Sequence, residues 1–403
     1  MFTLSEADNL RLKTENSSEH YQWLDSVKGI AVLWIALFHC ILSYGGNLPW
    51  PITPGSFFDF VRRCAQGSLI GGLSCAFEGI IAAIIQRGAQ GVGVFILFSG
   101  FGLTYSLVKR GGVETSWAVW YRRRFVRLFP VYWLAHLVFL VSPFAVLHDP
   151  VDYRFLLSFF GDRVFPVDKM FFYLVPAWWF LGLLIELYIV FPFLFKLMQR
   201  LGWVKYLVLC ILLDSAARYI LASVLEASGY YAMGAFFVCR LWEFAAGMAL
   251  GKLMAEKSHV TLGWLLSWKG FFAGVFVYTL GVYAYQPNFL DSFSDGLTAM
   301  GLSVILMHVA QRLDKAPVLG RAIALAGVYS YGIYLFHQPY VMYAGETLRP
   351  YNLTVFLIFA SAVTVVVASV SMGVEFATNR TVNFFAGKIF SRFSPPAVKK
   401  GEE

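Results

Sequence analysis

The chain has 403 residues, of which 58% are hydrophobic and only 14% charged, and its mean hydropathy is +0.64. Soluble domains carry about 25% charged residues, so this composition excludes a soluble globular protein and indicates a polytopic membrane protein. The net charge of +8 does not indicate nucleic-acid binding, because membrane proteins concentrate Lys and Arg in their cytoplasmic loops.

Repeated apolar runs of about 20 residues predict an all-α membrane bundle with about ten transmembrane helices. The predicted helices span residues 29–45, 90–108, 129–147, 173–197, 203–223, 235–254, 269–285, 295–311, 321–343 and 353–375. We expect one membrane domain over residues 21–378, with polar cytoplasmic tails at 1–20 and 379–403.

The orientation follows from the basic residues, which gather in alternate connections and are missing from 225–234 and 281–294. The positive-inside rule therefore places both termini in the cytoplasm. Residues 67–86 are also apolar, but a span there would invert everything after it, so we expect an interfacial or re-entrant helix on the outer side. Cys64 and Cys75 fall in this outer segment, where a disulfide is one option.

The first apolar run carries Asp25, Lys28 and His39, which are spaced so that all three lie near one stripe of an α-helix. Ionisable groups in lipid are costly and usually mark a pathway or a reaction centre. One interpretation is that Lys28 reaches the interface and His39 bonds a neighbouring helix. The interpretation we favour is functional, with His39 near mid-depth as the proton acceptor for a hydroxyl.

The second predicted helix is rich in small residues around Ser99, which either allow close helix packing or line a tunnel for a thin acyl-pantetheine arm. An arginine cluster precedes the third helix and consists of Arg122, Arg123, Arg124 and Arg127. Forked guanidinium groups suit phosphate. The cluster therefore either grips lipid headgroups or holds a phosphorylated cytoplasmic donor such as coenzyme A.

Later helices carry further polar groups inside apolar runs. Glu186 lies near mid-depth and needs a partner or a proton. The pairs Asp214–Arg218 and Arg240–Glu243 have the spacing of intrahelical ion pairs, so we expect them to be structural.

The last notable stretch, Ser330–Pro339, contains His337 close to the expected outer end of the ninth helix. This histidine is either a residue of the helix-end interface or one that meets an acceptor entering from outside.

Four stretches in the same order resemble the acyltransferase-3 family of integral membrane acyltransferases, which O-acylate bacterial surface polysaccharides and related glycans. They are Leu24–His39, Phe95–Phe101, Arg122–Tyr132 and Ser330–Pro339. The resemblance covers about residues 20–375. Lys28 departs from the family pattern, which usually has arginine at this position; lysine keeps the charge but loses the bidentate fork.

The resemblance implies acyl-CoA, usually acetyl-CoA, as the cytoplasmic donor substrate, with no permanently bound cofactor and no metal. The catalytic residues that we predict are His39, Asp25, Lys28 and Glu186. The donor-binding residues that we predict are Arg122, Arg123, Arg124, Arg127 and Ser99. For acceptor binding we predict His337 and Tyr334.

We therefore expect transfer of a short acyl group to a hydroxyl of a surface glycan or its lipid-linked precursor, in the bacterial plasma membrane. His39 would act as general base or carry the acyl group transiently. The expected partners are acyl-CoA, the glycan acceptor, membrane lipids and a polysaccharide synthesis complex, with no nucleic acid. Two alternatives stay open, namely a transporter or flippase for glycans or lipids, and a scaffold subunit of such a complex.

Overall fold

The computed structural model describes residues 22–45, 48–49, 52–65, 67–112, 114, 116–143, 153–161, 174–225, 234–284 and 291–393. All regular structure in these ranges is helical, which confirms the predicted all-α class. The longer helices are α2 (Gln22–Tyr44), α4 (Leu69–Gln86), α5 (Gly91–Lys109), α6 (Trp117–Val141), α8 (Trp179–Leu201), α9 (Trp203–Tyr219), α10 (Leu241–Glu256), α12 (Trp268–Tyr283), α13 (Asp291–Leu313), α15 (Ser330–Leu348) and α16 (Leu353–Phe393). The shorter ones are α3 (Pro54–Ala65), η1 (Arg87–Gln90), α7 (Tyr153–Ser158), η3 (Pro176–Trp178), η4 (Ile220–Val224), η6 (Phe237–Arg240), α11 (Ser258–Leu265) and α14 (Pro317–Val328).

Seven helical runs of the described chain are long and apolar enough to cross a membrane, and an eighth is reached if the bent pair α14–α15 is one span. The protein is therefore a multi-pass membrane helix bundle, and the count in the described residues is somewhat below the predicted ten. One further predicted span corresponds to α12, whose 16 residues rise about 24 Å, less than the roughly 30 Å of a bilayer core. Another corresponds to η6 and α10, which follow each other directly and carry Arg240, Glu243, Lys252 and Glu256.

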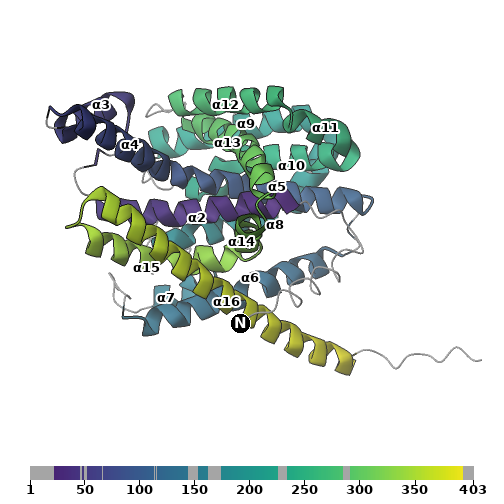
Figure 1. Cartoon of the computed structure of the whole chain (residues 1–403). Helices are drawn as coiled ribbons and strands as arrows, with labels where there is room; N and C mark the ends of the chain where they lie inside the picture. Colours follow the sequence, from purple (N-terminus) through teal and green to yellow (C-terminus); the bar gives the residue numbers. More distant parts are fainter. Residues whose placement is uncertain are drawn as a thin grey trace, which may run out of the picture.

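The helix α2 runs through the middle of the bundle (Figure 1). It packs along α14, α15, α13 and α5, which come from both halves of the chain. We use α2 to name the two ends of the bundle, the Asp25 end and the Tyr44 end.

The predicted single helix over 321–343 is wrong, because α14 and α15 meet at 87°. A Cβ at Gly327 would collide with the Asp25 carbonyl, so α14 lies directly on the start of α2. A Cβ at Gly345 would collide with the Cys40 carbonyl, so α15 follows α2 toward the Tyr44 end. In Figure 1, α14 is seen nearly end-on while α2 crosses the view.

Several boundaries also differ from the prediction. α4, η1 and α5 form one helical run of 41 residues from Leu69 to Lys109, so residues 69–86 extend the second span and do not form a separate interfacial or re-entrant helix. α6 starts at Trp117 and not near residue 129, so the arginine cluster is part of that helix. α16 continues past residue 375 to Phe393.

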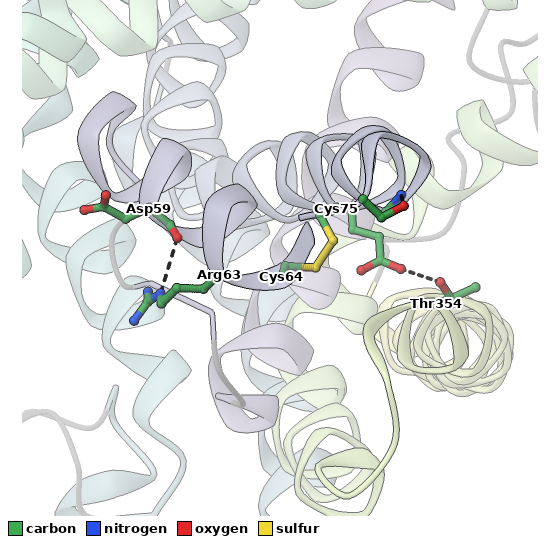
Figure 2. Close-up of a disulfide and its surroundings, with 8 residues drawn as sticks. Asp59, Arg63, Cys64, Cys75 and Thr354 are labelled. Atoms are coloured by element: carbon green, nitrogen blue, oxygen red, sulfur yellow. Dashed lines mark hydrogen bonds between the residues drawn. A yellow bond between two sulfur atoms is a disulfide. The ribbon is translucent and has the colours of Figure 1, made fainter. Parts of the chain in front are cut away.

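A disulfide between Cys64 and Cys75 joins α3 to α4 at the Tyr44 end, so the bond that the sequence allowed is present (Figure 2). The same end is tied to α16, because the Thr354 hydroxyl donates to the Glu78 carboxylate at 2.7 Å. The α3–α4 hairpin is thus held both covalently and by hydrogen bonding.

Candidate active site

A pair of histidines lies where α2 and α15 run side by side. Nε2 of His337 is 3.1 Å from Nδ1 of His39. His337 is fully buried and His39 is half-buried. His39 lies 14 positions beyond Asp25, about 21 Å along the helix, so it sits in the third of α2 nearest the Tyr44 end.

The hydrogen bonds of this pair determine which ring nitrogens carry protons. Nδ1 of His337 faces the carbonyls of Tyr334 at 2.7 Å and Ile333 at 3.1 Å, and a carbonyl only accepts. This nitrogen therefore carries the proton, and Nε2 of the neutral ring is an acceptor. Nδ1 of His39 then faces two acceptors, the His337 ring and the Ile35 carbonyl at 3.0 Å, and donates to them. Nε2 of the neutral His39 ring is consequently the unprotonated, basic nitrogen.

Pro339 explains the hydrogen bonds that hold the start of α8 against α15, next to the histidine pair. A proline has no N–H, so it cannot donate to the carbonyl four residues earlier, which is that of Leu335. The indole Nε1 of Trp178 donates to this carbonyl at 2.9 Å. The Gln338 side chain accepts from the backbone N–H of Ala177 at 2.8 Å. The interior proline thus creates the acceptor that positions the buried Trp178.

At the other end of α2, the carboxylate of Asp25 and the ammonium of Lys28 form an ion pair at 2.8 Å. The Asp25 side chain is 4% exposed and that of Lys28 is 25% exposed, so the pair is reachable from one side. Ser26 donates at 2.8 Å to Asp314, which directly follows the end of α13. The predicted stripe therefore consists of the Asp25–Lys28 ion pair at one end of α2 and the separate His39 nearer the Tyr44 end.

An arginine-lined cavity of about 250 Å³ opens at the Asp25 end. Its walls are Leu103, Arg123, Arg124, Arg127, Leu128 and Tyr188. Arg124 is half-buried, and its guanidinium lies 4.2 Å from the centre of the Trp120 ring, whereas Arg123 and Arg127 are exposed. Stacking on an aromatic ring fixes the plane of the guanidinium and leaves its edge for an anion.

Three predicted residues lie elsewhere. Arg122 is exposed and is not part of the cavity wall. Glu186 accepts from the backbone N–H of Phe237 at 3.1 Å, which ties α8 to η6. Ser99 is half-buried on α5 next to Gly100, where a Cβ would collide with the Phe244 carbonyl on α10. The small residues at this point therefore serve close packing.

A further predicted residue, Tyr334, is buried between the cavity and the histidine pair, with its ring 5.3 Å from that of Phe180. Both side chains belong to one apolar cluster with Leu103 and Leu128 of the cavity wall. The cluster thus connects the arginine cavity with α15 beside the histidines.

Sequence reasoning missed Glu375, which is buried on α16 and accepts from the backbone N–H of Gly332 at 2.6 Å. It caps α15 just after the 87° bend, while the Tyr331 hydroxyl donates to the Leu128 carbonyl at 2.9 Å. A lone carboxylate inside an otherwise apolar helix is the signal that could have identified it.

The two predicted ion pairs are present, with Arg218 and Asp214 at 3.0 Å and Arg240 and Glu243 at 2.9 Å. Asp295 of α13, which was not predicted, bridges them with contacts of 2.8 Å to Arg218 and 2.9 Å to Arg240. Three acidic and two basic side chains therefore form one network at the ends of α9, α10 and α13.

Fold and site together define an integral membrane protein with a histidine pair inside the bundle and a separate arginine-lined cavity at one end. The model of the acyltransferase-3 family, described as an acyltransferase domain, matches residues 21–373. The chain belongs to this family and is a membrane acyltransferase. Comparisons with curated proteins and with solved structures gave no match.

Proposed function

We propose that this acyltransferase moves an acetyl or other short acyl group from acyl-CoA to a hydroxyl of a surface glycan or its lipid-linked precursor. The Asp25 end faces the cytoplasm in this proposal and the Tyr44 end faces the periplasm of a bacterium. Two observations support the orientation. The basic connections lie at the Asp25 end, and the Cys64–Cys75 disulfide lies at the Tyr44 end, where an oxidising compartment would preserve it.

The observation that carries the proposal is the half-buried His39, whose basic Nε2 has no hydrogen-bond partner among the described residues. A general base must present an unprotonated nitrogen to the substrate hydroxyl, and the His337 pair leaves this nitrogen bare. The acceptor would reach His39 from the nearby Tyr44 end.

The donor would enter at the opposite end. Arg123, Arg124 and Arg127 would bind the CoA phosphates, for which forked guanidinium groups are suited. The pantetheine arm would extend along the apolar cluster that contains Leu103 and Tyr334, toward His39. Asp25 and His39 are about 21 Å apart along α2, so the thioester and the hydroxyl would meet inside the bundle and not at the Asp25 end.

In the transfer step, the acceptor O–H bond breaks as its proton moves to Nε2 of His39. The hydroxyl oxygen forms the ester bond to the acyl carbon, and the C–S bond of the thioester breaks. The proton then passes from the imidazolium to the CoA thiolate. His337 accepts from Nδ1–H of His39 throughout, and thereby stabilises the imidazolium and keeps the ring oriented.

The first test replaces the base. His39→Ala should lower O-acyl transfer to isolated membranes by at least about 100-fold, the usual contribution of a general base. His308→Gln is the matched control, because His308 is also buried but its ring Nε2 donates to the Leu265 carbonyl at 2.9 Å and is not available as a base. Near-normal transfer by the His39 variant, with equal protein in the membrane, would exclude this role.

The second test addresses the donor. Acetyl-CoA should raise the thermal unfolding temperature of the purified protein, and Arg124→Ala should remove most of that rise. Arg122→Ala should keep it, because Arg122 does not line the cavity. An equal loss in both variants would indicate general charge attraction and not a specific phosphate site. No response to CoA in the unaltered protein would favour a transporter.

A further inference from the structure

A second site is indicated by Arg87, which starts the short turn η1 between α4 and α5. The next residue, Gly88, packs against the Trp34 carbonyl and the side chain of Phe38. The Trp34 indole also donates to the Ile84 carbonyl at 2.8 Å. Because Trp34 lies halfway along α2, the backbone of Arg87 is level with the middle of this membrane-spanning helix.

Arg87 differs from its polar neighbours in that its side chain has no ion pair or hydrogen bond among the described residues, although its backbone N–H donates within the helix. Gln86 accepts from the backbone N–H of Ile52 and donates to the Pro49 carbonyl, at 2.9 and 3.0 Å. Gln90 accepts from the Tyr278 hydroxyl at 2.7 Å. A half-buried guanidinium at this depth is costly unless an anion or water reaches it, so a bound anion is the simplest compensation.

The side chain lines an open groove of about 370 Å³. The other described wall residues are Ile52, Thr53, Phe57, Ile80, Ala83 and Ile84, so Arg87 is the only charged group among them and the lining is mainly apolar. Ile80 and Ile84 are 51% and 56% exposed, which leaves the groove open toward the lipid. An apolar channel with one guanidinium matches a hydrocarbon chain that carries a phosphate.

The groove is also held in shape. Gln86 fixes the backbone at Ile52 on one wall. The Cys64–Cys75 disulfide fixes α3 to α4 (Figure 2). Gly79 of α4 lies against the Phe57 ring with no space for a Cβ. A preformed site loses less conformational entropy on binding.

From these observations we infer that the groove binds the phosphate of a lipid in the leaflet at the Tyr44 end. Gly88 packs on Phe38, the neighbour of His39, so the lipid headgroup would lie beside the proposed reaction centre. A lipid-linked acceptor carries this chemistry, and this last connection rests on the proposed function. The binding itself does not depend on it.

The experiment measures lipid binding without an acyl donor. The purified full-length protein is titrated with dioleoyl phosphatidic acid in detergent, and bound lipids are counted by native mass spectrometry. Arg87→Gln should weaken one lipid site by at least about tenfold, as expected for a lost charge-assisted hydrogen bond. Arg63→Gln is the matched control, since Arg63 is an exposed arginine of α3 that donates to the Asp59 carbonyl at 3.3 Å.

A second variant, Ile84→Trp, keeps Arg87 but narrows the groove, and it should weaken the same site. Unchanged lipid binding in both variants would overturn the inference. Competition by millimolar glycerol 3-phosphate would also overturn it, because it would indicate a site for free phosphate. His39→Ala should bind phosphatidic acid normally. A His39 variant that acylates normally would therefore refute the proposed function and leave the lipid site standing.

Discussion

The tautomer of His39 is set by neighbours that carry no charge. Two backbone carbonyls fix the proton of His337, and His337 in turn fixes the proton of His39. A carboxylate beside a histidine base has the same effect on its tautomer, but here a neutral ring supplies the acceptor. Neutral partners avoid the cost of burying a further charge in the bundle.

In the proposed mechanism His337 positions the His39 ring, and we expect the activities of its variants to differ in a defined order. His337→Ala should lower kcat by at least about tenfold while the KM for the acyl donor stays unchanged, because the tautomer of His39 is no longer fixed. His337→Gln should retain more activity, since its amide oxygen can accept from Nδ1–H of His39. Steady-state kinetics on purified protein measures both constants. Equal activity of the Ala and Gln variants would contradict the acceptor role.

The residue types of the site were largely predictable, but their partners were not. Helical periodicity suffices to put Asp25 near Lys28 and to group the arginines on α6, because these contacts are local. The contact between His39 and His337 joins residues 298 positions apart, and nothing in the local sequence specifies it. Asp295 and Glu375 were missed for the same reason, as each completes a contact with distant helices.

At the scale of elements, the contact between α15 and the start of α8 depends on the backbone N–H that Pro339 lacks. Trp178→Phe removes the indole N–H that donates to the Leu335 carbonyl, and Pro339 has no N–H to take its place. The change should lower the free energy of unfolding by about 1–3 kcal/mol. In the background Pro339→Ala the same change should cost less, because the substituted residue has an N–H that can donate to the Leu335 carbonyl within the helix. Thermal unfolding of the four proteins of this cycle gives the difference. Equal costs in both backgrounds would contradict this account.

The network around Asp295 allows a second prediction at this scale. Asp295→Ala leaves Arg218 and Arg240 with fewer partners near the membrane interior, and it should destabilise the protein by at least about 1 kcal/mol. This expected loss of stability is at the low end for broken buried ion pairs because the Asp295 side chain is 32% exposed. Asp59→Ala, which alters an exposed pair on α3, should have no measurable effect on the unfolding temperature. A comparable loss in both variants would argue against the network.

The predicted element boundaries were wrong where tertiary contacts, and not the hydropathy of the segment, decide where a helix ends. The bend after Val328 is held by Glu375 of α16 and by the Leu128 carbonyl of α6, so an apolar run that suggested one helix forms two. By contrast, α5 ends and α9 starts within a residue of the predicted positions, since basic residues flank both boundaries.

At the scale of the whole molecule, the proposed orientation can be tested with the protein's own cysteines. In a variant lacking the buried Cys40, Cys210 and Cys239, only the disulfide pair remains. A membrane-impermeant maleimide applied to intact spheroplasts should label it only after treatment with an impermeant reductant. Labelling that requires lysis would place the α3–α4 hairpin on the cytoplasmic side and contradict the proposed orientation. Labelling of intact spheroplasts without reductant would show that Cys64 and Cys75 are not paired, and would remove the disulfide as support for that orientation.

The distance between the arginine cavity and His39 has a consequence for the economy of the cell. In the proposed function, the nucleotide part of the donor would stay at one membrane surface while its acyl group is consumed closer to the other, so the spent coenzyme would be released where metabolism can recharge it. Two solutions that never mix would thus exchange an activated group through a single protein. An exterior glycan would then be esterified without any coenzyme leaving the cell, and the energy for that bond would come from the cytoplasm.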